Sequence, residues 1–168
     1  LGFFGGDEII CHTGSADPTS TMADTVRDTF PRGKAIIWIN ECGGTWPGHS
    51  MPENVDWVSA DKYRGKKKHK KKKKDYIQKV KEMNDDIRKL LHDHQKIALI
   101  PGAGHPRDNF KICDDECTAQ IEYQDAKDFK DWAKSDDRVV AVMPYAWIRD
   151  KQDGGPEVGL KYMDDGDN

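Results

Sequence analysis

Five short apolar runs rich in β-branched residues recur along the chain, and each ends in a polar or glycine-rich stretch. Segments with apolar residues at helical spacing lie between them. Strands that alternate with helices in this way run parallel, and such sheets are covered on both faces. We therefore predict an α/β fold built from parallel β/α repeats. The five predicted strands are Gly2–Glu8, Ala35–Glu41, Val55–Tyr63, Lys96–Gly104 and Val139–Trp147.

Three amphipathic helices are predicted between these strands. Residues 9–18, which follow the first strand, are expected to form a connecting loop. The first helix begins at Ser20 or Thr21, whose hydroxyl groups can cap a helix, and ends before Pro31. Apolar residues at helical spacing predict the other two helices at Tyr76–His92 and Glu116–Lys134.

Length and composition place the predicted elements in one domain. The chain has 168 residues, is 36% apolar and contains five Trp, which favours a buried core. Residues 1–150 are predicted to form a partial or incomplete (β/α) barrel, because five β/α units are too few for an eight-stranded barrel of about 250 residues. We expect an upstream segment of a longer protein, or a second copy in a homo-oligomer, to complete the sheet. Residues 64–75 are predicted to be an exposed lysine-rich insertion, and residues 151–168 an irregular acidic tail.

The apolar runs and the cysteines limit the class of protein. No apolar run approaches the roughly 20 residues that a membrane-spanning helix needs, so no membrane span is predicted. Cys113 and Cys117 lack the second close pair that a zinc site of this spacing would need. We therefore expect disulfides or structural thiols, with no metal and no cofactor. The even number of cysteines favours a secreted protein in an oxidising compartment.

Two glutamates lie at the carboxyl ends of predicted strands, which is where parallel sheets carry their active-site and ligand-binding residues. Neighbouring strands are about 4.8 Å apart, and glycoside hydrolysis needs two carboxyl groups roughly 5 to 9.5 Å apart. Glu41 is therefore the candidate general acid and Glu8 the candidate nucleophile or base. The alternative is that an acid after a strand caps the next turn or helix. Predicted substrate contacts near this pair are the acids Asp7 and Asp61 and the aromatic residues Trp46, Tyr63, Tyr145 and Trp147.

Several motifs resemble the later half of a (β/α)8-barrel glycoside hydrolase of the clan A type. They are Asn40-Glu41 at a strand end, the run Val-Asp-Trp-Val-Ser-Ala-Asp-Lys-Tyr that ends at Tyr63, and Trp147 at the end of the last strand. The resemblance implies that Glu41 is the acid/base and that Asn40, Tyr63 and Trp147 contact the substrate. That clan carries its nucleophilic glutamate on the seventh strand, but the corresponding residues 97–104 contain no acid. Either Glu8 substitutes for it, or the barrel does not hydrolyse its ligand.

Residues 66–74 contain eight lysines, interrupted only by His69. Like charges at this density repel one another, so the run should be exposed. Its functional interpretation is contact with a polyanion, such as nucleic acid, a sulfated glycan or an acidic membrane. The simpler interpretation is a solvated insertion that balances an acidic body, since the net charge of the whole chain is −3. The candidate polyanion contacts are Lys66, Lys67, Lys68, Lys70, Lys71, Lys72, Lys73 and Lys74.

These observations favour a carbohydrate-active protein that resembles glycoside hydrolases and hydrolyses or binds a glycan at the carboxyl ends of its strands. One alternative is a non-catalytic module that binds a glycan, or a polyanion through the lysine run. Another is a structural or matrix protein, for which the acidic tail is the sequence feature.

Overall fold

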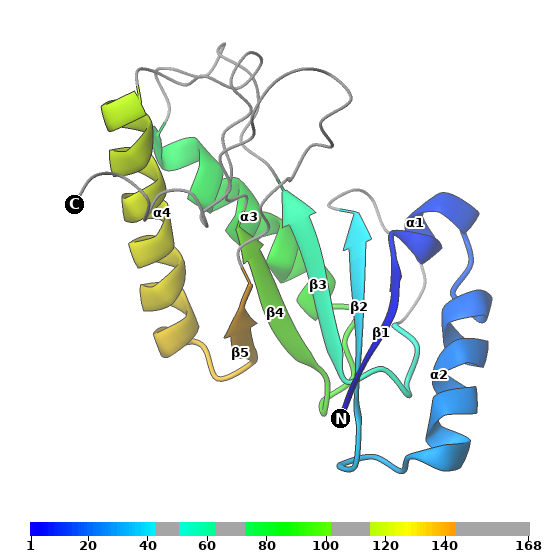
Figure 1. Cartoon of the computed structure of the whole chain (residues 1–168). Coiled ribbons are helices and arrows are strands. Elements are labelled where there is room, and N and C mark those ends of the chain that lie inside the picture. Colours follow the sequence, from blue (N-terminus) through cyan, green and yellow to red (C-terminus); the bar gives the residue numbers. More distant parts are fainter. Residues whose placement is uncertain (43–50, 63–72, 102–114, 144–168) are drawn as a thin grey trace, which may run out of the picture.

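The computed structural model describes residues 1–42, 51–62, 73–101 and 115–143. Five strands form one all-parallel sheet, with described helices between all consecutive strands except β2 and β3, which confirms the α/β fold of alternating β/α elements (Figure 1). Each strand lies within the run that predicted it or extends it by one residue. The strands are β1 (Gly2–Asp7), β2 (Ile36–Cys42), β3 (Trp57–Lys62), β4 (Lys96–Pro101) and β5 (Val139–Val142).

The strands lie side by side in the order in which the chain makes them, from β1 to β5. A doubly wound sheet reverses this order at a switch point and carries helices on both faces. A sheet in chain order with right-handed crossovers carries all its connecting helices on one face. One hydrophobic cluster accordingly joins all four described helices to a single face of the sheet. Among the described residues no helix packs on the second face, although Ser59, Ala98 and Ile100 of that face are buried, so the prediction that both faces are covered is not contradicted.

Four helices are described, at α1 (Ile9–Thr13), α2 (Asp17–Thr29), α3 (Lys73–Arg88) and α4 (Asp115–Ser135). The last two confirm the predicted helices, although α3 begins earlier, inside the lysine run. The loop predicted over residues 9–18 is wrong, because α1 forms there and α2 begins at Asp17. For α1 the error has a physical reason: its N-cap residue, Glu8, makes no side-chain cap, so the start of this helix carries no local capping signal.

Alternating side chains give the sheet two different faces. On the helix face, Ile37, Ile39 and Val58 are fully buried against the helices. Each such side chain stabilises the fold by about 1.5–3 kcal/mol relative to an exposed one. The opposite face, called the open face here, carries Phe4, Trp38, Asn40, Ser59 and Ala98, which are paired in register across the neighbouring strands.

The amino ends of the strands are joined by the carboxylate of Asp56, which precedes β3. Its Oδ2 accepts the backbone N–H of Ile37 at 2.7 Å and a bond from the guanidinium of Arg27 on α2. Arg32 lies 3.5 Å from its other oxygen. One carboxylate thus connects α2, β2 and β3 at the end of the sheet away from the predicted chemistry.

We expect Asp56→Ala to lower the free energy of unfolding by about 3 kcal/mol. The change leaves the nearly buried Arg27 guanidinium and the Ile37 N–H without their acceptor. Urea denaturation measures the loss. The control is Asp86→Ala, which breaks the exposed Asp86–Lys89 pair and should change the stability little. Equal effects of the two substitutions would contradict the structural role of Asp56.

Candidate functional site

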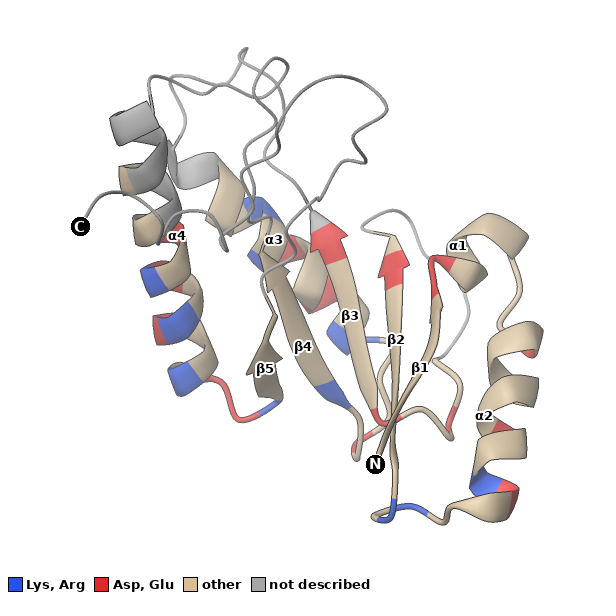
Figure 2. Cartoon of the chain, in the orientation of Figure 1, with Lys and Arg blue, Asp and Glu red and all other residues tan. Residues whose placement is uncertain are grey.

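Acidic residues gather at the carboxyl ends of β1, β2 and β3 (Figure 2). They are Asp7, Glu8, Glu41 and Asp61, the same four acids that the sequence singled out. The structure divides them between different surroundings, because neighbouring residues of a strand point to opposite faces of the sheet.

An irregularity in β1 decides where Asp7 points. Phe4 pairs with Trp38, but Asp7 pairs with Asn40, so β1 uses one more residue than β2 over this interval. A regular register would place Asp7 beside Glu41 on the helix face. The extra residue turns it onto the open face instead. The bulge is built from Gly5 and Gly6, of which Gly6 has a φ of 130° that other residues rarely adopt.

A chain of hydrogen bonds crosses three strands on the open face. The indole N–H of Trp38 donates to Ser59 Oγ at 2.7 Å, and the Ser59 hydroxyl donates to Asn40 Oδ1 at 2.8 Å. The Asn40 amide then donates to Asp7 Oδ1, also at 2.8 Å. Asn40 and Ser59 are buried, whereas Asp7 is exposed. This series of hydrogen bonds therefore fixes the exposed Asp7 carboxylate through buried partners, and each polar group in the series has a hydrogen-bonding partner.

An aromatic pair lies on the same face as this chain. The rings of Phe4 and Trp38 have centroids 4.7 Å apart and planes tilted by 42°. Phe4 keeps 56% of its surface exposed and Trp38 is half-buried. Because the pair and Asp7 are connected through Trp38, Ser59 and Asn40, this face combines an apolar surface with a fixed hydrogen-bond acceptor.

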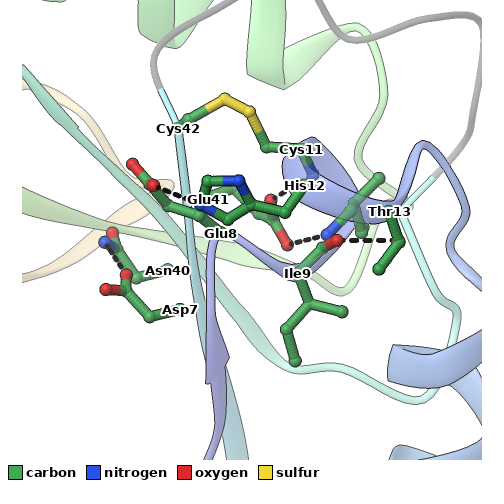
Figure 3. The surroundings of a disulfide bond; sticks show 10 residues. Asp7, Glu8, Ile9, Cys11, His12, Thr13, Asn40, Glu41 and Cys42 are labelled. Carbon is green, nitrogen blue, oxygen red and sulfur yellow. Dashed lines mark hydrogen bonds and ion pairs between the residues drawn. A yellow bond between two sulfur atoms is a disulfide. The ribbon is translucent and has the colours of Figure 1, made fainter.

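Glu41 follows Asn40 and points to the opposite face, toward α1 (Figure 3). Its two carboxylate oxygens accept the backbone N–H groups of Ile10 at 3.0 Å and Cys11 at 3.2 Å. Only 1% of its surface is exposed. Glu41 thus caps the first turn of α1 from a neighbouring strand. The alternative that the sequence left open was a cap on the next turn or helix, whereas α1 precedes β2 in the chain.

Burial raises the pKa of the Glu41 carboxyl above its ordinary value of 4.5. The N–H groups of Ile10 and Cys11 lower it, and the nearby charges of Glu8 and Asp7 raise it. The net shift is upward. Glu41 is therefore a carboxyl group whose charge is opposed by its surroundings although two backbone groups bind it.

Glu8 lies at the junction of β1 and α1 in a left-handed conformation, with φ 53° and ψ 28°. Among the described residues it is the one non-glycine residue with a positive φ. Its carboxylate is 3.0 Å from Nε2 of the exposed His12 and does not cap α1. In Figure 3 the carboxylates of Glu8 and Glu41 are turned toward different partners. The catalytic roles assigned to these two residues stay predictions.

A disulfide joins the same two elements that Glu41 connects. Cys11 of α1 is bonded to Cys42, the last residue of β2, with Cα atoms 6.0 Å apart (Figure 3). The sequence left disulfides and structural thiols open and predicted no pairing, so the pairing of these two cysteines comes from the structure. A cross-link over 31 residues stabilises a fold by about 4 kcal/mol in the chain-entropy description. The start of α1 is therefore attached to the end of β2 by a covalent bond and by the Glu41 carboxylate.

The other predicted contacts are only partly described. Asp61 is half-buried at the end of β3, on the same face as Asn40 and Ser59, and pairs in register with Cys42 and Ile100. The remaining predicted contacts lie outside the described residues, except that the backbone of Lys73 and Lys74 opens α3. Those outside are Trp46, Tyr63, Tyr145, Trp147, the lysines at 66–68 and 70–72, Cys113 and the tail at 151–168.

The sequence interpretation missed Phe4, Trp38 and Ser59. It treated the second strand as buried on both faces, so it gave Trp38 no role at the surface. The alternation within this strand carried a signal, because Trp38 and Asn40 are two residues apart and must share a face. The hydrogen bonds that Ser59 makes with Trp38 and Asn40 depend on the register of two strands, and a local sequence pattern does not predict that register.

The described residues give no support for a metal site or a membrane helix. They hold no group of three or more His, Cys, Asp or Glu side chains arranged to bind a metal ion. None of their helices is both long enough and apolar enough to cross a membrane. Searches of known proteins add no relationship: no family model matches the chain, and no curated protein matches it in sequence.

The raised pKa of Glu41 predicts how stability depends on pH. A carboxyl group with a higher pKa in the folded state binds more protons there, so its contribution favours folding below pH 4.5 and is lost as the pH rises through the folded-state pKa. We expect the stability of the unsubstituted protein, relative to Glu41→Gln, to fall over this interval. Urea denaturation of both proteins between pH 4 and pH 8 measures the difference. A constant difference would show that the pKa is not raised.

Proposed function

We propose that this chain is a carbohydrate-binding protein built on a β/α-barrel plan, which holds a glycan on its open face near the carboxyl ends of the strands. The observation that carries the proposal is the combination of the Phe4–Trp38 pair with the bonded chain that ends at Asp7. A pyranose ring has an apolar face that stacks on aromatic rings and hydroxyl groups that need fixed acceptors. Both requirements are met on one face of the sheet.

The order of the strands supports a relationship to barrel glycosidases. A sheet in chain order with helices on one face is the arrangement of consecutive units in a (β/α)8 barrel, whose inner face corresponds to the open face here. Asn40, which the resemblance to clan A glycoside hydrolases singles out, bonds to Asp7 on that face. In this proposal further strands beside β1 or β5, from an upstream segment or a second copy, complete the barrel. The Cys11–Cys42 disulfide is compatible with secretion.

Substitution of Phe4 tests glycan binding. We expect the chain to bind neutral oligosaccharides on a glycan microarray, and Phe4→Ala to weaken the best of them about tenfold, or about 1.4 kcal/mol, through lost stacking. Titration calorimetry with hexasaccharides of glucose, mannose and N-acetylglucosamine measures the affinity. The control is Tyr123→Ala, which removes an exposed aromatic residue of α4 and should leave binding unchanged. No binding to any glycan, or equal affinity of wild type and Phe4→Ala, would refute the proposal.

Glycoside hydrolysis is the second candidate function, because burial shifts the pKa of Glu41 upward, which is the direction that a general acid needs. In that case α1 must first move away from the buried Glu41, which then protonates the leaving oxygen while Glu8 acts as nucleophile or base. We expect Glu41→Gln and Glu8→Gln each to lower the hydrolysis of aryl glycosides by about a hundredfold or more. Calorimetry on the same variants separates lost turnover from lost binding. Full activity of Glu41→Gln would remove this candidate.

Polyanion binding by Lys66–Lys74 is a further alternative, on the basis of sequence alone. It differs from glycan binding on the open face in its response to salt, since the release of counterions makes binding to a polyanion weaken steeply as the salt concentration rises.

A further inference from the structure

The short helix α1 covers Glu41 and is attached to β2 through adjacent residues. The N–H groups of Ile10 and Cys11 bind the Glu41 carboxylate, and the Cys11 sulfur is bonded to Cys42. Cys11 is exposed, while Glu41 has 1% of its surface exposed. An exposed residue that carries one end of the disulfide thus lies next to a carboxylate that solvent does not reach. Figure 3 shows the disulfide and the Glu41 carboxylate beside α1.

We propose that the Cys11–Cys42 disulfide is a redox-controlled lock, whose reduction releases α1 from the end of β2 and exposes the Glu41 carboxylate. In the oxidised protein Glu41 is a structural cap. In the reduced protein it becomes an accessible acid at the carboxyl end of the sheet. This inference goes beyond glycan binding and does not depend on it.

The remaining attachments of α1 are few. A helix of five residues has little stability of its own, because the free-energy cost of nucleation cancels most of the stabilisation from its few hydrogen bonds. The pair between Glu8 and His12 is exposed and stabilises little. Burial of Ile10 in the core, the bond from the Glu8 N–H to the Asn40 carbonyl and the two N–H bonds to Glu41 are the contacts that hold α1 after reduction. Two features oppose the attachment of α1: the left-handed backbone at Glu8 and the desolvation of the Glu41 charge. Release of α1 relieves both.

The reduction is an ordinary thiol–disulfide exchange with a dithiol. A thiolate of the reductant attacks the sulfur of the exposed residue Cys11, breaks the bond to Cys42 and forms a mixed disulfide. The second thiol of the reductant then displaces Cys11. Two electrons and two protons pass to Cys11 and Cys42, which become thiols, and the reductant becomes a disulfide. No other partner is required.

Carboxyl labelling of the full chain tests the lock. The protein is treated with a water-soluble carbodiimide and glycine ethyl ester, before and after incubation with dithiothreitol, and labelled residues are identified by mass spectrometry. We expect Glu41 to be labelled at least ten times faster after reduction. The half-exposed Glu8 should be labelled in both states, and the buried Asp125 of α4, with 7% of its surface exposed, should stay protected in both.

Two cysteine variants separate this bond from the rest of the chain. Cys11→Ser combined with Cys42→Ser should label at Glu41 without any reductant. Cys113→Ser combined with Cys117→Ser is the matched control and should keep Glu41 protected until dithiothreitol is added. Hydrogen exchange should show faster exchange at the Ile10 and Cys11 amides only. Unchanged labelling of Glu41 after reduction would overturn the proposal, because α1 then holds without the bond. Faster labelling of Asp125 would also overturn it, because the bond then stabilises the whole fold.

Discussion

The structure depends on one topological constraint, which is that its parallel strands lie in the sheet in chain order. Right-handed crossovers then bring every connecting helix to the same face. That face becomes the core, and the other face carries no described helix. Side chains alternate along a strand, so this constraint assigns opposite surroundings to residues that are adjacent in sequence. Asn40 and Glu41 illustrate the result: Asn40 joins the bonded chain on the open face, and Glu41 is buried against α1.

Much of the fold was predictable because the strands are marked by composition. The run Ala35–Glu41 begins with apolar residues and ends in Asn40 and Glu41, and parallel pairing follows from the helices that lie between such runs. The position of α1 was not predictable in the same way. Its capping acceptor, Glu41, comes from a strand about 30 residues further along the chain. A local sequence pattern carries no information about a contact over that separation. Without that contact, residues 9–13 are predicted to form a loop.

The candidate site was predictable in composition but not in geometry. The acids at strand ends were all identified, and Asn40 was identified by resemblance. Their division between two faces depends on the extra residue in β1, since Asp7 shares a face with Asn40 only because of the bulge at Gly5 and Gly6. Close packing adds a second reason for glycine at these positions. A Cβ on Gly5 would lie 2.3 Å from the Met22 side chain, and one on Gly6 would lie 2.1 Å from Ile9. The two glycines are therefore explained by backbone geometry and close packing.

The way Glu41 is held carries an energetic conflict that the disulfide helps to resolve. Its two bonds to backbone N–H groups favour the charged carboxylate, but burial opposes that charge more strongly, so the pKa rises. A neutral cap such as Ser or Asn would avoid this cost, yet at the start of α1 the N-cap residue is Glu8, whose left-handed backbone turns its own side chain to His12. The cap must therefore come from β2. A long-range cap requires α1 and β2 to stay in register, and the bond between Cys11 and Cys42 maintains that register. The buried acid and the cross-link are thus two parts of one junction, in which the covalent bond offsets the cost of burying a charge.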